Sequence, residues 1–321
     1  MIEERAAKSE GIVASGEAVY GSPSSDLVGT NAGARQVSPL QPGSGALEDY
    51  AEGALSRVVM AAPPGTLERR RELALALRAL APGGGLVALA PKDKGGARLR
   101  KELKGFGCEV EEVGRRHHRI CSCRRPEALD GVDEAIALGA PRRLEAIDAW
   151  TQPGVFSWDR IDPGTALLLA HLPALAGRGA DLGCGVGHLA RAALASPRVE
   201  HLTLIDIDRR AVEAARRNID DPRVELRWAA ATAPEADGDA AGALRELDFV
   251  VTNPPFHDGG TEDRQLGLAF IRRAAEALRK GGALWLVANR HLPYEAELAA
   301  LFARVDVRAQ QCGYKVFEAR R

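Results

Sequence analysis

Residues 181–187 read DLGCGVG, and this stretch decides the fold of the C-terminal half of the chain. It ends a short apolar run at residues 179–182 and precedes residues 188–194, whose apolar side chains recur at helical spacing. Glycines at such a turn let the backbone bend sharply and let a ligand lie against it without a Cβ clash. The pattern predicts a strand, a glycine-rich turn and a helix, with a ligand bound at the carboxyl end of the strand.

A second carboxylate follows at a spacing that suits a nucleoside-bearing ligand. Residues 202–205 form the next apolar run, and Asp206 comes directly after it, 23 residues beyond Gly183. A carboxylate about 20 residues beyond the glycine turn is placed to bind ribose hydroxyls. Asp181 can hold an amino group of the same ligand. Because the glycines are spaced Gly-x-Gly-x-Gly, this motif alone leaves a nicotinamide dinucleotide and other nucleoside cofactors open.

A second motif, Asn253-Pro254-Pro255-Phe256, directly follows a buried apolar run at residues 247–252. An exocyclic amino group on a base becomes nucleophilic only when its lone pair is held toward the incoming methyl group. The side-chain oxygen of Asn253 and the carbonyl of Pro254 can accept its N–H bonds, on a turn stiffened by two prolines. Phe256 offers a stacking surface for a base taken out of its helix. Together the two motifs predict an S-adenosylmethionine-dependent methyltransferase that works by positioning and electrostatics.

The two halves of the chain share landmarks that indicate an internal repeat. Residues 57–60 (RVVM) match residues 248–251 (DFVV), a Pro-Pro pair follows each, and glycine pairs follow the next predicted helix in both halves. The first copy has Ala62 where the second has Asn253, and no glycine-rich loop precedes it. We therefore predict an α/β fold of two tandem class I, Rossmann-like methyltransferase domains, of which the N-terminal one is degenerate.

Composition sets the expected domain boundaries. The chain has 321 residues, of which 45% are hydrophobic and 27% charged, as in ordinary globular proteins. Residues 1–46 are rich in Gly, Ser, Ala and Pro with few large apolar groups, so we expect a disordered tail. The degenerate domain is expected over residues 47–128, a linker over 129–153, and the catalytic domain over 154–321.

Charge and cysteine content bear on compartment and metals. The formal net charge of −1 excludes no class of partner. Five cysteines without framework spacing favour reduced thiols and give no set of four zinc ligands. The sequence shows no signal peptide and no segment near the roughly 20 apolar residues that span a bilayer. We expect a cytoplasmic protein without a membrane segment or a metal, and the sequence does not indicate its oligomeric state.

With these motifs in hand, the chain resembles the bacterial ribosomal RNA guanine-N2 methyltransferases, and their small-subunit (16S) form more than the large-subunit form. That family has a C-terminal catalytic domain and an N-terminal domain of the same fold that binds no cofactor, in agreement with the degenerate repeat. The resemblance covers about residues 47–321 and rests on residues 154–157 (GVFS), 162–165 (DPGT), 181–185 (DLGCG), 253–259 (NPPFHDG), 287–289 (VAN) and 292–294 (LPY).

The resemblance implies a role for each candidate site residue. It implies that the cofactor residues are Asp181, Gly183, Gly185, Asp206 and Thr165, and that the guanine-holding residues are Asn253, Pro254 and Phe256. Many related enzymes carry an Asp or Asn after the third strand to bind the adenine amino group. Residues 228–232 (WAAAT) offer neither, so the sequence does not indicate the adenine contact.

A basic stretch in the degenerate half points to a polyanionic partner. Residues 92–125 hold 11 Lys and Arg against 5 Asp and Glu. This excess suits a surface that binds phosphates, and the alternative is a solvated helix face beside a charged hairpin. We expect ribosomal RNA or a ribosomal subunit as the partner.

Three other functions stay open on the sequence alone. The first is methylation of another planar amino group, in large-subunit ribosomal RNA, at adenine N6 or on a protein glutamine; enzymes with the last two targets usually have Tyr where this chain has Phe256. The second is a non-catalytic RNA-binding protein, against which the intact Asp181 and Asn253 argue. The third is an NAD-dependent oxidoreductase, for which the sequence shows no catalytic acid.

Overall fold

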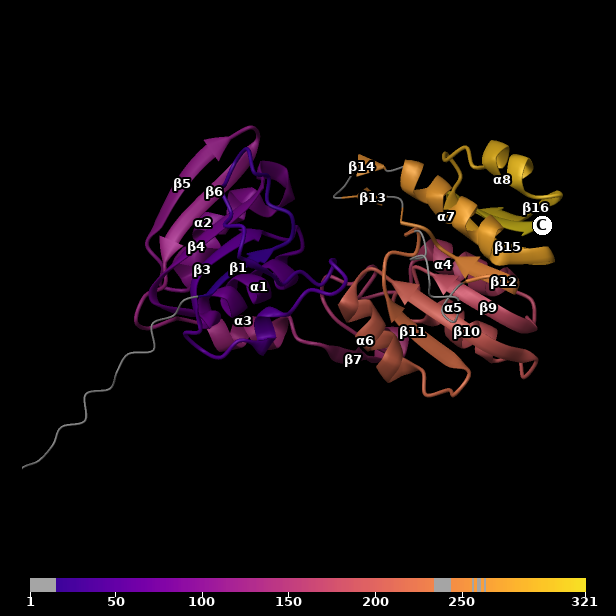
Figure 1. Ribbon diagram of the computed structural model, residues 1–321, viewed down its shortest axis with the longest axis horizontal. Coiled ribbons are helices and arrows are strands. Elements are labelled where there is room, and N and C mark those ends of the chain that lie inside the picture. The colour runs from indigo at the N-terminus through magenta and orange to yellow at the C-terminus, as the bar shows by residue number, and fades with distance from the viewer. Residues whose placement is uncertain (1–15, 234–243, 256, 259–260, 263) are drawn as a thin grey trace, which may run out of the picture. The chain divides into compact units, whose positions relative to one another are not determined.

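A computed structural model describes residues 16–233, 244–255, 257–258, 261–262 and 264–321, and the side chains of residues 256–264 are outside the description. The chain divides into two compact units. The N-terminal unit comprises residues 1–38 and 44–138, and the C-terminal unit comprises residues 39–43 and 139–321. Each unit has its own sheet and helices (Figure 1).

The N-terminal unit is built on a six-stranded sheet in the order β2-β1-β3-β4-β6-β5. The first four strands in this order are parallel, and β6 runs antiparallel to both β4 and β5. The strands are β1 (Gly16–Tyr20), β2 (Arg35–Gln36), β3 (Leu55–Ala61), β4 (Leu80–Pro91), β5 (Val110–Arg115) and β6 (His118–Arg124). The helices are η1 (Leu47–Asp49), α1 (Thr66–Ala79), η2 (Lys92–Gly96), α2 (Ala97–Gly105) and α3 (Val132–Leu138).

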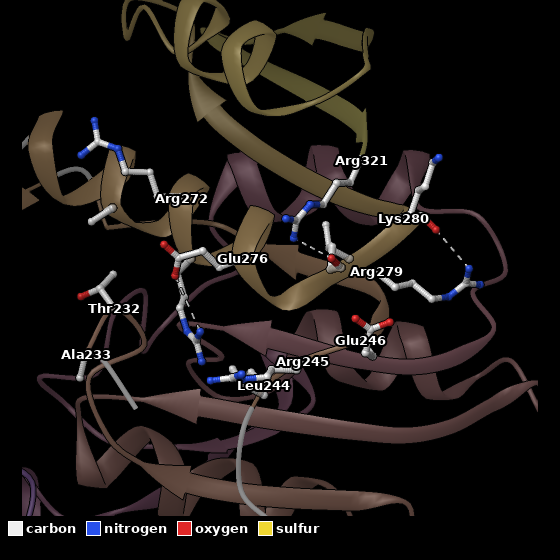
Figure 2. A pocket seen from close by; sticks show the side chains of 13 residues that line it. Thr232, Ala233, Leu244, Arg245, Glu246, Arg272, Glu276, Arg279, Lys280 and Arg321 are labelled. Atoms are coloured by element: carbon white, nitrogen blue, oxygen red, sulfur yellow. Dashed lines mark hydrogen bonds and ion pairs between the residues drawn. The ribbon is translucent and has the colours of Figure 1, made fainter. Parts of the chain in front are cut away.

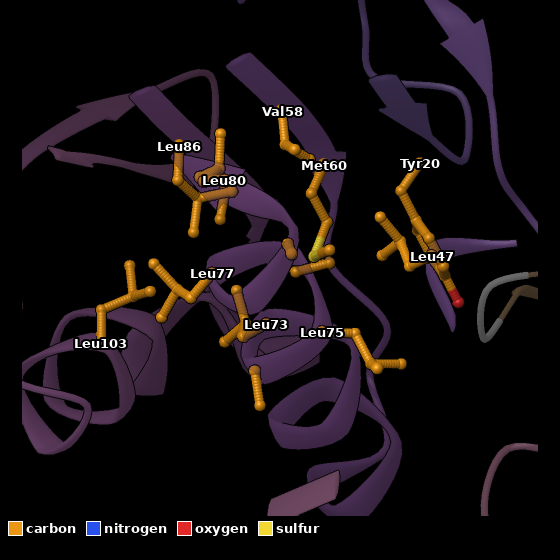
Figure 3. Close-up of a cluster of buried hydrophobic side chains, with 14 of the residues drawn as sticks. Tyr20, Leu47, Val58, Met60, Leu73, Leu75, Leu77, Leu80, Leu86 and Leu103 are labelled. Carbon is orange, nitrogen blue, oxygen red and sulfur yellow. The ribbon is translucent and has the colours of Figure 1, made fainter. Parts of the chain in front are cut away.

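The N-terminal unit has a hydrophobic core of its own (Figure 3). Leu73 and Leu77 of α1 are fully buried in one cluster with Met60 of β3 and Leu86 of β4. Burying one such side chain contributes about 1.5–3 kcal/mol, so the cluster is a large stabilising contribution to this unit.

Residues 16–46 are not the disordered tail that the sequence predicts. Strand β1 pairs in parallel with β3, with Ala18 opposite Val58 and Tyr20 opposite Met60. Ala18 and Tyr20 are buried in the core of the unit. The prediction from composition was wrong here because a strand added to an existing sheet needs only a few apolar side chains to reach the core. Residues 1–15 lie outside the described part of the chain.

The expected linker over residues 129–153 is also wrong, because both of its halves are structured. Helix α3 places Val132 and Ala135 in the core of the N-terminal unit. Strands β7 (Arg142–Leu144) and β8 (Ala149–Thr151) form an antiparallel hairpin in the C-terminal unit, with η3 (Glu145–Ile147) between them. The boundary between the units therefore falls at residues 138 and 139.

The C-terminal unit is built on a seven-stranded sheet in the order β11-β10-β9-β12-β15-β17-β16. The first five strands in this order are parallel, and β17 runs antiparallel to its two neighbours. The strands are β9 (Gly177–Leu182), β10 (Val199–Asp206), β11 (Val224–Trp228), β12 (Leu247–Thr252), β15 (Leu278–Asn289), β16 (Arg304–Gln311) and β17 (Tyr314–Arg320). A separate hairpin joins β13 (His257–Asp258) and β14 (Thr261–Glu262).

Helices cover both faces of this sheet, as the alternation of buried side chains requires. Val250 of β12 packs in one cluster with α7, and its neighbours Phe249 and Val251 pack in another with α4 and α5. The helices are α4 (Pro163–His171), α5 (His188–Leu194), α6 (Arg209–Asn218), α7 (Arg264–Ala277) and α8 (Glu295–Leu301). Within the part of the chain that the structure describes, no helix is long and apolar enough to cross a membrane.

The two sheets share one strand order, which confirms the predicted pair of class I methyltransferase folds. The order β10-β9-β12-β15-β17-β16 of the second sheet corresponds strand by strand to β2-β1-β3-β4-β6-β5 of the first. Strands β1 and β2 are therefore the counterparts of β9 and β10. The N-terminal unit keeps the topology of the repeat even where its sequence has lost the glycine-rich loop.

Candidate active site

The candidate site lies at the carboxyl ends of three adjacent parallel strands. Leu182 of β9 is opposite Ile205 of β10 and Thr252 of β12, so the residues that follow these strands meet at one edge of the sheet. The hydroxyl of Thr252 donates to the carbonyl of Leu182 at 2.6 Å and fixes this register. The glycine-rich loop and the Asn253 motif, whose preceding residues Leu182 and Thr252 are 70 positions apart, are therefore neighbours in the fold.

The glycine-rich loop has the tight turn that its sequence predicts. Gly183, Gly185 and Gly187 have φ values of +75°, +53° and +92°, in the left-handed region that favours glycine. The N–H of Gly183 donates to the carbonyl of Ile205 at 2.8 Å, so the loop stays against β10. A Cβ on Gly187 would lie 2.8 Å from the side chain of Ile219. The glycines are needed for the loop's shape and leave its backbone open to a ligand.

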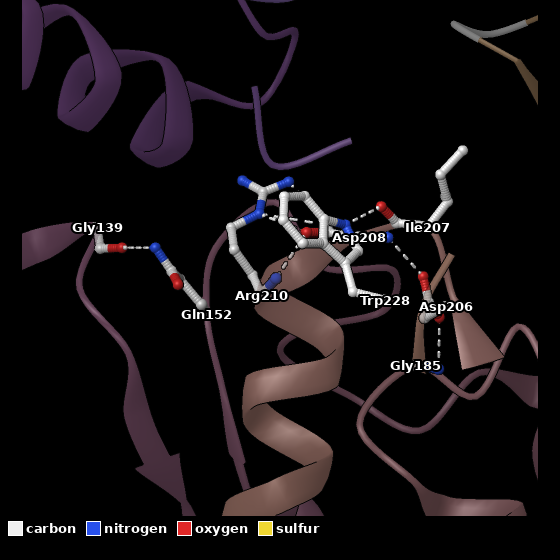
Figure 4. Close-up of polar contacts among 8 residues, drawn as sticks. All are labelled: Gly139, Gln152, Gly185, Asp206, Ile207, Asp208, Arg210 and Trp228. Atoms are coloured by element: carbon white, nitrogen blue, oxygen red, sulfur yellow. Dashed lines mark hydrogen bonds and ion pairs between the residues drawn. The ribbon is translucent and has the colours of Figure 1, made fainter. Parts of the chain in front are cut away.

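Asp206 ties the glycine-rich loop to the end of β10 (Figure 4). Its carboxylate accepts the N–H of Gly185 at 2.8 Å through one oxygen and the N–H of Asp208 at 2.9 Å through the other. Burial raises the pKa of Asp206 to about 6, and the backbone N–H groups oppose that rise. Each oxygen keeps further acceptor capacity for a ligand hydroxyl, because an ionised carboxylate has about four acceptor sites.

Asp181 is a buried acid near the end of β9. It has no exposed surface, and neither carboxylate oxygen receives a well-formed hydrogen bond from the described residues. Burial and the nearby charge of Asp206 raise the pKa of Asp181 to about 8, and the N–H of Ala190 offsets this only in part. A buried polar group without a partner is costly, so this carboxyl is suited to receive a cationic group from a ligand.

The side chain of Asn253 is anchored at one end and free at the other. Its amide nitrogen donates to Asp162 Oδ2 at 3.0 Å and to Thr165 Oγ1 at 2.9 Å. Its oxygen Oδ1 is buried and has no hydrogen-bond partner in the described parts of the chain. Pro254, which follows, is buried, whereas Phe256 lies outside the described residues. Asn253 thus presents an acceptor and no donor to a ligand.

One pocket joins the glycine-rich loop to Asn253. Thr165, predicted to lie near the cofactor, lines the pocket with Gly183 and Gly185, while Asp181 and Asp206 do not line it. Sequence reasoning quoted Asp162 only as part of a family motif and gave it no role, although Asp162-Pro163 is the expected start of a helix with a capping carboxylate and proline at its first position. The lining residues are Phe156, Ser157, Arg160, Asp162, Thr165, Gly183, Cys184, Gly185, Val186, His188, Leu189 and Asn253.

Trp228 stands at the end of β11, where many related enzymes have a residue for the adenine amino group. Its indole N–H donates to the carbonyl of Ile207 at 2.8 Å (Figure 4). The guanidinium of Arg209 lies 5.6 Å from the centre of the Trp228 ring. The side chain of Ile207 is 45% exposed beside Asp206. Residues 228–232 hold no Asp or Asn for that role, and we assign no adenine contact to them.

A second pocket lies beside α7, where β12 and β15 begin (Figure 2). It is rich in arginine, but its arginines have partners within the protein. Arg272 pairs with Glu297 at 2.5 Å, and Arg279 pairs with Asp248 at 2.6 Å. Because strands β12 and β15 start here, this pocket is remote from Asn253, and we assign no ligand to it.

In the N-terminal unit, the turn that corresponds to the Asn253 motif is occupied by a buried arginine side chain of the same unit. Arg69 is fully buried and donates through Nη1 to the carbonyls of Pro63 at 3.2 Å and Pro64 at 2.7 Å. Its other two nitrogens donate to the carboxylate of Glu102, both at 2.8 Å. Ala62 replaces the asparagine. The carbonyls of this degenerate turn are therefore occupied by a guanidinium of the same chain.

Replacing Arg69 with methionine is expected to destabilise the N-terminal unit by about 3–5 kcal/mol, because Glu102 would be left buried and unpaired. Urea unfolding followed by circular dichroism measures this loss. The double variant R69M/E102M removes both charges and should recover a large part of it. A single variant as stable as the wild type would show that the pair is not buried in solution.

The parallel sheet, the glycine-rich loop and the anchored Asn253 define a class I methyltransferase. The sequence matches the methyltransferase small domain family over residues 146–318. It is 36% identical over 263 residues to Ribosomal RNA small subunit methyltransferase C of Pseudomonas aeruginosa (strain LESB58), covering 80% of this chain and 77% of that protein. The corresponding protein of Shewanella loihica is 34% identical, with 78% and 72% covered. The chain belongs to the ribosomal RNA small subunit methyltransferase C family, as its motifs predict.

A solved structure extends the similarity to both units. The T. thermophilus 16S rRNA N2 G1207 methyltransferase, in complex with AdoMet and guanosine, is similar with a TM-score of 0.74 and 25% identity. The similarity covers 96% of this chain and 88% of that chain. The degenerate N-terminal unit is therefore part of the shared fold, together with the unit that carries the site.

Proposed function

We propose that this chain transfers the methyl group of S-adenosylmethionine to the exocyclic N2 amino group of a guanine in 16S ribosomal RNA. The observation that carries the proposal is the free, buried Oδ1 of Asn253 beside the glycine-rich loop. The similarity to the T. thermophilus enzyme supports the choice of guanine, and we propose the nucleotide that corresponds to its G1207 as the target. A cytoplasmic location follows from this substrate.

The residues present fit the cofactor. The buried carboxyl of Asp181, which lacks a well-formed hydrogen bond from the described residues, suits the ammonium group of the methionine end, and the left-handed glycines leave room for the chain of the cofactor. Asp206 has acceptor capacity left for the ribose hydroxyls. When bound, S-adenosylmethionine supplies an electrophilic methyl group on a sulfonium.

The protein's part in the reaction is to orient the amino group. Asn253 Oδ1 and the carbonyl of Pro254 accept the two N–H bonds of guanine N2, which turns the nitrogen lone pair toward the methyl group. The N–C bond forms as the S–C bond breaks, and N2 then releases one proton to solvent. Phe256, by resemblance, stacks on the base. Such a site works by alignment and fixed dipoles, so no strong base is required.

Nucleoside mass spectrometry tests the proposed function directly. Ribosomal RNA from a strain that lacks the gene should lose N2-methylguanosine from one 16S fragment, and the purified protein with S-adenosylmethionine should restore it. Loss of N2-methylguanosine from 23S RNA in that strain would favour the large-subunit target. Formation of N6-methyladenosine by the purified protein would favour an adenine target. RNA binding without any methyl transfer would support a non-catalytic role.

We also propose that the N-terminal unit docks RNA through a basic surface formed by α2 and the β5–β6 turn. Several cations of residues 92–125 pair within the unit, such as Arg119 with Glu112 and Arg125 with Glu52. Exposed cations gather on α2 and at the turn, where phosphates can reach them, and one of them, Arg116, also pairs with Asp26. This basic surface comprises Arg98, Arg100, Lys101, Lys104, Arg115 and Arg116.

Reversing three charges of the basic surface, in the variant K101E/R115E/R116E, is expected to weaken RNA binding by about 10–100-fold, because each lost phosphate contact lowers affinity and reduces its salt dependence. Filter binding at several salt concentrations measures both effects. A matched variant reverses three exposed cations of the C-terminal unit, Arg216, Lys280 and Arg304, and should have a smaller effect. Equal losses in the two variants would remove the docking proposal.

A further inference from the structure

We infer that Asp162 and Thr165 are positioning residues that fix which way the amide of Asn253 faces. The inference rests on the proposed role of Asn253 as the acceptor for the target amino group. An amide has an oxygen that accepts and a nitrogen that donates, and rotation by half a turn exchanges them. Only one of the two orientations can receive an N–H bond from guanine N2.

The chemistry of Asp162 decides the orientation. A carboxylate only accepts hydrogen bonds, so the group of Asn253 that lies 3.0 Å from Asp162 Oδ2 has to be the amide nitrogen. Thr165 Oγ1 accepts from the same nitrogen at 2.9 Å. With both amide hydrogens used in this way, Oδ1 is left facing away from them, buried and without a partner among the described residues. The orientation is thus set by donor and acceptor matching and does not depend on packing alone.

Helix α4 holds these two anchors in place. Asp162 Oδ2 also accepts the N–H of Thr165 at 2.9 Å, which caps the helix, so one oxygen serves both the helix and Asn253. A Cβ on Gly164 would lie 2.8 Å from the ring of Tyr314, so the first turn of α4 lies close against β17. The anchors are therefore part of the folded frame and not of a free loop.

Loss of either anchor should affect the chemical step more than binding. Without them the amide would also populate the flipped orientation, in which its NH₂ group faces the NH₂ group of guanine and two donors oppose each other. The productive fraction of the enzyme–RNA complex would fall, while the glycine-rich loop and Asp181 would be unchanged. We expect a lower kcat with S-adenosylmethionine affinity preserved.

Two pairs of variants separate positioning from helix capping. Ser and Asn cap helices about equally well, but only Asn at position 162 is long enough to place an acceptor beside Asn253. D162S should lower the single-turnover rate about tenfold or more, while D162N should retain most of it. T165V should lower the rate about tenfold, and T165S, which keeps the hydroxyl, should retain most of it.

The measurements are single-turnover methylation of the 16S substrate, calorimetric affinity for S-adenosylmethionine and the melting temperature of each variant. D162S and D162N with equal rates would overturn the inference and leave Asp162 as a helix cap. A T165V variant that loses cofactor affinity but keeps its rate would also overturn it. A wild-type protein that methylates no guanine N2 would instead remove the proposed function itself, so the two failures are distinguishable.

Discussion

Replacing Asn253 with alanine is expected to lower the rate of methyl transfer by about 10²–10³-fold, the usual cost of losing one fixed hydrogen-bonding group at a reacting centre. Alanine removes Oδ1, the buried acceptor that we assign to guanine N2. S-adenosylmethionine affinity should change little, because the two carboxylates assigned to the cofactor, Asp181 and Asp206, are on the other strands β9 and β10. Single-turnover transfer of a labelled methyl group to the 16S substrate measures the rate, and calorimetry measures the cofactor affinity.

Asn289 provides a matched control for this variant. It is the asparagine at the carboxyl end of the next strand, β15, and its oxygen accepts the N–H of His291 at 3.2 Å. Asn289→Ala should therefore keep the rate close to that of the wild type. If Asn253→Ala methylates as fast as Asn289→Ala, the amide of Asn253 is not the acceptor and the proposed mechanism is wrong.

The parts of this fold that could be predicted are those with strong local patterns. Helix α5 and strand β12 were predicted at their observed bounds, because a glycine-rich turn or a Pro-Pro pair marks an end of each. The repeat could be predicted because both copies keep the same landmarks. The strand pairing of residues 16–36 could not, since their composition is that of a loop and their stability comes from β3.

In the candidate site, too, local sequence motifs predict single residues but not the contacts between distant ones. Asn253 could be named from its motif, but Asp162 lies 91 positions away, and only the fold brings the two together. Thr165 was predicted beside the cofactor from a family resemblance, and its hydroxyl in fact binds the amide of Asn253. A cofactor contact for Thr165 stays a prediction. The occupied turn at Arg69 could not be predicted either, because its partner Glu102 is on another helix.

Replacing Asp181 with asparagine is expected to change cofactor affinity and the free energy of unfolding in opposite directions. Asp181→Asn is expected to weaken S-adenosylmethionine binding about 10–100-fold, since an amide lacks the charge that pairs with an ammonium group. The same change should stabilise the cofactor-free protein at pH 7 by on the order of 3 kcal/mol. Isothermal calorimetry measures the first effect, and urea unfolding at several pH values measures the second.

The stabilising effect of Asp181→Asn follows from the raised pKa of Asp181. Asp181 has a pKa of about 8 in the folded protein, against about 3.9 in an unfolded chain. Between these values the folded state binds a proton that the unfolded state does not, so stability falls as pH rises from about 4 to 8. An amide at this position does not titrate, so the Asp181→Asn variant should have a flatter profile. In the wild type, cofactor binding at pH 7 should release up to about one proton, and affinity should increase toward pH 8.

The second carboxylate of the site, Asp206, provides a comparison for the Asp181→Asn variant, because Asp206 is hydrogen-bonded to the backbone. Its two oxygens already accept the N–H groups of Gly185 and Asp208, so an amide at position 206 would turn a donor toward one of them. Asp206→Asn should therefore weaken cofactor binding and stabilise the protein less than Asp181→Asn does, because the gain from removing a charge whose pKa is raised to about 6 is offset by this clash. Two carboxylates at one site would lose the same function with different changes in unfolding free energy. If Asp181→Asn were destabilising, Asp181 would be well hydrogen-bonded within the cofactor-free protein, and its assignment to the ammonium group would lose its basis.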